Sequence, residues 1–160
     1  MADDSPLNEP SAILLAGRAA IEAGEIGAAR ATLDRLDRVG THGAMLDADR
    51  RTILAGVAAA EGRPTEALVE YRDAQRRWRE LGLDFDLARS GLGFVTSLPD
   101  EPEAREAAEE SRRIFERLGA RPFVERVDAA LGAAAAPTRT GRPASGRSAT
   151  PSRETEATSA

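Results

Sequence analysis

A pattern of small and apolar residues that occurs three times along the chain limits its fold more than any other feature. The clearest copy is residues 64–81. In it, mostly apolar side chains recur every three or four residues, which places them on one face of a helix. They are Ala67, Leu68, Tyr71, Ala74, Gln75, Trp78 and Leu81. Pro64 suits the first helical turn, and Gly82 suits the left-handed residue that ends a helix. Because one such helix cannot bury its own apolar face, it must pack against others.

Two further copies surround this helix, one upstream at 22–36 and one downstream at 99–119. Aligning the small residue early in each copy pairs Ala29, Ala67 and Ala104, at spacings of 38 and 37 residues. The second and third copies also end alike, with Leu-Gly at Gly82 and Gly119. A fixed period of this length is typical of proteins built from stacked helical repeats.

These positions resemble a tetratricopeptide repeat. Gly62, Ala67, Tyr71 and Ala74 have the spacing of the second half of that repeat, and Gly24 and Ala29 are similar to the same positions one repeat earlier. The third copy departs from it, with Pro99, Ala108 and Ser111 replacing the turn glycine, Tyr71 and Ala74, and its period exceeds the usual 34 residues. Residues 114–131 are also similar to the C-terminal repeat region of large bacterial ATP-dependent signalling regulators, of the LuxR-type or cyclase-linked sort.

The predicted fold is all-α: a right-handed antiparallel helix-pair repeat, or tetratricopeptide-like solenoid, with about three helix pairs and a capping helix. Residues 1–9 are expected to be a flexible N-terminus, 10–134 the repeat domain, and 135–160 a disordered tail rich in Arg, Ser, Thr and Pro. The helices are expected near 11–23, 25–39, 44–61, 64–81, 85–98, 101–118 and 122–134. Asp100 with Glu103 fits a capping box at the start of the sixth.

Composition excludes several functional classes. The chain has no Cys, and all 22 basic residues are Arg, so thiolate chemistry, Schiff-base lysines and a P-loop lysine are absent. Four Arg and two acidic residues lie beyond 136, which leaves 18 Arg against 25 acids, a net charge of −7, in the remainder. That charge disfavours nucleic acid as a partner. We therefore expect no catalytic residues, cofactor or metal site, and interpret the single histidine, His42, as a loop residue exposed to solvent.

Three residues have both a functional and a packing interpretation. Trp78 follows two arginines, as in some nucleic-acid patches, but its place on the apolar face predicts a core residue whose indole N–H needs an acceptor. Gly91 and Gly93 lack the strand and third glycine of a nucleotide-binding turn, so we interpret them as sites of close helix packing.

The resemblance implies a non-catalytic protein–protein interaction module, adaptor or regulatory, that binds a partner segment in a concave groove. Carried across residue by residue, the repeat pattern implies five inward-facing positions: Arg18, Asp49, Thr52, Arg89 and Thr96. The signature residues Gly24, Ala29, Gly62, Ala67, Tyr71, Ala74 and Ala104 are expected to serve packing alone. Two alternatives stay open: a self-associating structural protein, and a regulatory C-terminus that separated from a larger ATP-dependent regulator. No long apolar segment or basic leader is evident, so we expect a cytoplasmic protein without membrane contact.

Overall fold

Seven α-helices make up almost all of the chain that the structure describes, residues 9–40 and 42–135 of a computed structural model, and no strand occurs in these ranges. Residues 1–8, Thr41 and 136–160 lie outside the described residues. Of the N-terminus predicted at 1–9 and the tail predicted at 135–160, only Glu9 and Ala135 are therefore described, and both belong to helices. Every predicted helix is present, with each end within two residues of the expected position. The helices are α1 (Glu9–Ala23), α2 (Ile26–Val39), α3 (Ala44–Ala60), α4 (Pro64–Leu81), α5 (Asp84–Ser97), α6 (Pro102–Arg117) and α7 (Arg121–Ala135).

Glycines at two of the turns have a backbone conformation that other residues adopt only with strain. Gly24, between α1 and α2, has φ 74°, and Gly62, between α3 and α4, has φ 73°. At both turns the chain reverses within two or three residues, so consecutive helices return alongside each other. These are the two glycines that the repeat pattern identified as turn residues.

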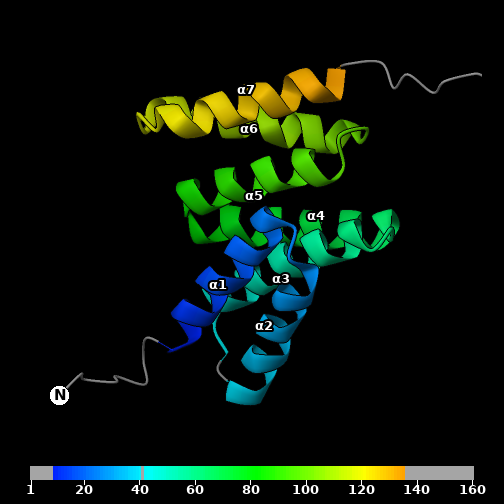
Figure 1. Ribbon diagram of the computed structural model, residues 1–160. Coiled ribbons are helices and arrows are strands. Elements are labelled where there is room, and N and C mark those ends of the chain that lie inside the picture. Colours follow the sequence, from blue (N-terminus) through cyan, green and yellow to red (C-terminus); the bar gives the residue numbers. More distant parts are fainter. Residues whose placement is uncertain (1–8, 41, 136–160) are drawn as a thin grey trace, which may run out of the picture.

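Successive helices pack in chain order, from α1 and α2 at one end of the molecule to α7 at the other (Figure 1). Within the pairs α1/α2, α3/α4 and α5/α6 the helices lie against each other, and α7 packs on α5 and α6. The odd-numbered helices also contact one another in sequence, α1 with α3, α3 with α5, and α5 with α7. The three aligned alanines, Ala29, Ala67 and Ala104, are each 0% exposed, so the pattern correctly located buried positions.

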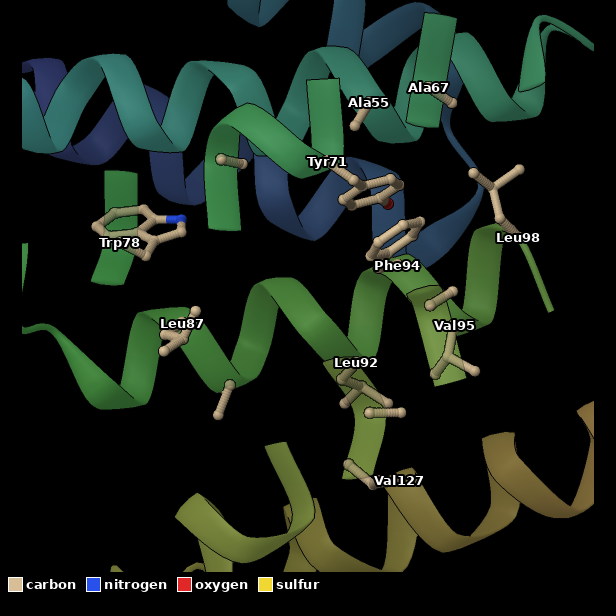
Figure 2. Close-up of a cluster of buried hydrophobic side chains, with 14 of the residues drawn as sticks. Ala55, Ala67, Tyr71, Trp78, Leu87, Leu92, Phe94, Val95, Leu98 and Val127 are labelled. Carbon is tan, nitrogen blue, oxygen red and sulfur yellow. The ribbon is translucent and has the colours of Figure 1, made fainter. Parts of the chain in front are cut away.

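The larger of two hydrophobic clusters runs from α3 to α7 and contains most of the aromatic residues. Tyr71 of α4 stacks on Phe94 of α5, with ring centroids 4.6 Å apart, and Trp78 lies further along α4 (Figure 2). The smaller cluster joins α1, α2 and α3 through Ile13, Leu33, Ile53 and neighbouring residues. Trp78 is therefore a core residue, as its position on the apolar face predicted.

One local prediction needs correction. No capping box forms at α6: Glu101 occupies the N-cap without a side-chain hydrogen bond, and Glu103 instead pairs with Arg72 of α4, whose Nε donates at 2.7 Å.

Two large apolar residues near the ends of helices, Phe85 and Leu118, are 39% and 49% exposed. Phe85 still packs edge-on against Phe115 and Phe123. Leu118 follows the last residue of α6, where the next turn leaves its side chain uncovered.

No helix within residues 9–40 and 42–135 combines the length and the apolar character that crossing a bilayer requires.

Candidate functional site

A cavity of about 190 Å³ opens between α1, α3, α4, α5 and α7, and all five residues predicted to face a groove line it. Arg18 comes from α1, Asp49 and Thr52 from α3, and Arg89 and Thr96 from α5. The fold thus brings together residues that are up to 78 positions apart in the chain. Of the signature residues expected to serve packing, Tyr71 also contributes to the lining; Trp78 lines it too.

Hydroxyl groups satisfy the polar atoms of the cavity floor. The indole Nε1 of Trp78 donates to Thr52 Oγ1 at 3.2 Å, and Thr52 in turn donates to the Ala48 carbonyl at 3.1 Å. The Ser90 hydroxyl lies 3.5 Å from Thr52 Oγ1. The predicted acceptor for the buried indole is therefore a residue of the groove itself, and the floor is fixed between α3, α4 and α5.

A buried ion pair joins α1 to α3 beside this floor. The Arg18 guanidinium contacts the Asp49 carboxylate through two nitrogens, and its Nη1 lies 3.3 Å from Asp86 Oδ1. Arg18 also lies over the Trp78 ring, 5.9 Å from its centroid. Burial raises the pKa of the Asp49 carboxyl, and the adjacent Arg18 cation opposes that rise. Arg18 is thus the structural cation of the site.

A second charged group lies where α1, α5 and α7 meet. Arg89 Nη2 is 3.5 Å from one oxygen of Glu22, and Arg126 Nη2 is 3.2 Å from the other. Burial, and after it repulsion from Arg18, lowers the pKa of the Arg89 guanidinium. Arg126 also lies over the Phe123 ring, 5.3 Å from its centroid. One carboxylate here serves two cations.

Sequence reasoning missed Glu22, Asp86, Phe123 and Arg126, which are among the other residues of the cavity lining. Glu22 and Arg126 are 104 residues apart, and the repeat pattern places neither of them among the groove residues. Their pairing depends on the position of α7 relative to α1, which no local sequence pattern encodes. Phe123 lies in α7, which the sequence predicted only as a capping helix.

The polar groups of the cavity lining are guanidinium, carboxylate, hydroxyl and one indole N–H, and each charged residue of the lining has an ion-pair partner. His42 is exposed in the turn before α3 and is not part of the lining. In the described part of the chain, no group of three or more His, Cys, Asp or Glu could hold a metal ion.

Comparisons with protein-family models, with curated proteins and with solved structures gave no significant match to this chain.

Proposed function

We propose that this protein is a non-catalytic protein–protein interaction module of tetratricopeptide-like type, and that it binds a segment of a partner protein in the cavity between α1, α3, α5 and α7. On this proposal the helix pairs α1/α2, α3/α4 and α5/α6 are the repeats and α7 is the capping helix. The first helix of each pair forms most of the inner wall, to which α4 adds Tyr71 and Trp78.

One observation carries the proposal. Five residues chosen only for their place in the repeat pattern, from three helices, line a single cavity that mixes charged and apolar side chains. A concave site with an apolar body and a few directed polar groups is typical of a binding site. The surrounding ion pairs and hydroxyl bonds hold the lining residues in fixed positions, which reduces the entropy lost when a partner binds.

The test is affinity capture from the native cytosol with the full chain as bait and Thr96→Arg as the blocked variant. Thr96 is exposed, lines the cavity, and its hydroxyl bonds only to the Leu92 carbonyl of its own helix. A long charged side chain there should therefore fill the cavity mouth without disturbing the core. Val69→Arg is the matched control, because Val69 is 56% exposed on α4 and outside the lining.

We expect one protein to be retained by the unaltered chain and by Val69→Arg and to be lost with Thr96→Arg. Equal retention by all three baits would contradict a role for the cavity. Reversing Arg18 is a poorer variant, because it would leave the buried Asp49 carboxylate beside a second negative charge.

The alternative is a self-associating structural protein. The observation in its favour is the exposure of large apolar side chains, among them Leu15, Met45 and Val69. Sedimentation across a wide concentration range distinguishes the two, since self-association through such side chains makes the measured mass rise with concentration. If the chain descends from a larger ATP-dependent regulator, its partner in the capture experiment should be a separate ATPase.

A further inference from the structure

We propose that the partner segment is anchored by an acidic side chain next to an apolar one, with the carboxylate binding Arg89 and the apolar group entering the cavity beside Phe123. This inference rests on the proposed function and names the chemistry of its partner. It comes from the uneven distribution of charge around the cavity.

Three guanidinium groups and three carboxylates line the cavity, but the ion pairs between them are unevenly distributed. Arg18 contacts two carboxylates, Asp49 and Asp86. The remaining carboxylate, Glu22, is left to serve both Arg89 and Arg126. The end of the cavity formed by α1, α5 and α7 therefore has a surplus of positive charge, while the Arg18 end has a surplus of negative charge.

Arg89 carries most of that surplus. Its side chain is only 22% exposed, yet its one ion pair spans 3.5 Å, well beyond the ~2.8 Å of a strong charge-assisted hydrogen bond. Arg18 lies close enough to repel it, while the carboxylates of Glu22, Asp49 and Asp86 attract it. Arg126 has less need of a further anionic partner, because its side chain is 47% exposed to solvent and lies over the Phe123 ring. A carboxylate from outside would give Arg89 the two-point contact that Glu22 does not provide.

The cavity that contains this cation also has an apolar part. Ile21, Leu92 and Phe123 line the same cavity as Arg89. A volume of about 190 Å³ exceeds the roughly 150 Å³ of a protein cavity known to hold benzene, so one aromatic or branched aliphatic side chain fits. An acidic residue adjacent to such a side chain could reach both features at once.

Trp78 makes this inference testable with small probes. It is the chain's only Trp and it lines the cavity, so its emission and its indole N–H resonance are sensitive to a ligand that binds there. The probes are three blocked dipeptides, N-acetyl-Phe-Glu amide and its Gln and Lys counterparts, titrated into the full chain. They differ only in one side chain, which is anionic in the Glu peptide, neutral and of the same shape in the Gln peptide, and cationic in the Lys peptide. None has a free terminal carboxylate.

We expect saturable binding of the Glu peptide, about tenfold or more weaker binding of the Gln peptide, and none of the Lys peptide. Arg89→Gln should remove the preference for Glu. Glu22→Gln, which removes the competing carboxylate from a half-exposed position, should tighten binding of the Glu peptide. Arg30→Gln on α2 is the matched arginine control, because its ion pair with Glu61 lies outside the lining.

Equal binding of all three peptides, or an unchanged preference in Arg89→Gln, would overturn the inference while leaving the cavity as a binding site. A Trp78 signal that none of the peptides alters would also overturn it. The proposed function is judged separately, by whether capture of a partner depends on position 96.

Discussion

The indole N–H of Trp78 on α4 donates to the hydroxyl of Thr52 on α3, 3.2 Å away, at the floor of the candidate binding cavity. Trp78 is 1% exposed, so this hydroxyl replaces the water that the indole would otherwise bind. One hydrogen bond therefore belongs both to the hydrophobic core and to the cavity lining. Stability of the α3/α4 pair and the shape of the cavity cannot be changed independently here.

Replacing Thr52 with Val should destabilise the protein by about 1–3 kcal/mol, because the buried indole N–H loses its acceptor while the side-chain volume is kept. Thr52→Ser retains the hydroxyl and should cost less. Urea unfolding followed by Trp78 emission measures both variants. Equal midpoints for the Val and Ser variants would show that the hydrogen bond contributes nothing.

Two glycines on α5 should respond in opposite directions to the same substitution. A Cβ on Gly91 would lie 2.2 Å from Ser111 Oγ and 2.8 Å from the Ala107 carbonyl oxygen, whereas one on Gly93 would meet nothing closer than the Tyr71 hydroxyl at 3.5 Å. Gly91→Ala should therefore destabilise by about 1–3 kcal/mol, since the backbone of α6 cannot move aside easily. Gly93→Ala should stabilise by up to about 1 kcal/mol through helix propensity.

Thermal melting of these two variants gives the comparison. If both substitutions raise the melting temperature, α5 and α6 do not approach each other as closely at Gly91 as the structure has them. If both lower it, the space beside Gly93 is smaller than described.

Local features of this fold could be predicted from the sequence, whereas contacts between distant helices could not. The turn glycines Gly24 and Gly62 and the buried alanines follow from local pattern, because backbone conformation and helical periodicity act over a few residues. The predicted capping box at Asp100 does not form, because the Glu103 carboxylate pairs with Arg72 on another helix. Likewise, the pairing of Glu22 with Arg126 depends on the placement of whole helices. Sequence reasoning therefore identified five residues of the cavity lining and missed others that come from the same helices and from α7.

Replacing Ala67 with Trp should abolish cooperative unfolding. Ala67 is 0% exposed where α4 packs against α3, and a side chain of that size can be accommodated only by separating the two helices. Val69→Trp, on the exposed face of the same helix, is the control and should leave the far-ultraviolet circular dichroism and the melting temperature nearly unchanged. An unaltered melting temperature for the Ala67 variant would invalidate the alignment of Ala29, Ala67 and Ala104.

The only tyrosine of the chain, Tyr71, gives a prediction about alkaline pH. Burial raises the pKa of its phenol from 10.0 to about 12, and the hydrogen bond with Ser97, 3.0 Å long, opposes part of that rise. Because the unfolded chain releases this proton first, the contribution of Tyr71 to stability is complete below pH 10. It falls as the pH rises from about 10 toward 12.

Tyrosinate absorbance near 295 nm measures this directly, since Tyr71 is the sole contributor. The native protein should titrate near pH 12, or ionise only as its helical signal is lost, and the chain in denaturant should titrate near pH 10. Ionisation near pH 10 with the helices intact would mean that Tyr71 is not buried against Phe94.

The most direct test of the central claim, that the cavity between α1, α3, α5 and α7 receives a partner segment, is site-specific photo-crosslinking. Benzoylphenylalanine placed at position 96, which lines the cavity, is compared with the same group at position 69 on the outer face of α4. The account predicts a discrete adduct with another protein from position 96 that position 69 does not form. Identical adducts from both positions, or an adduct only between two copies of this chain, would contradict it.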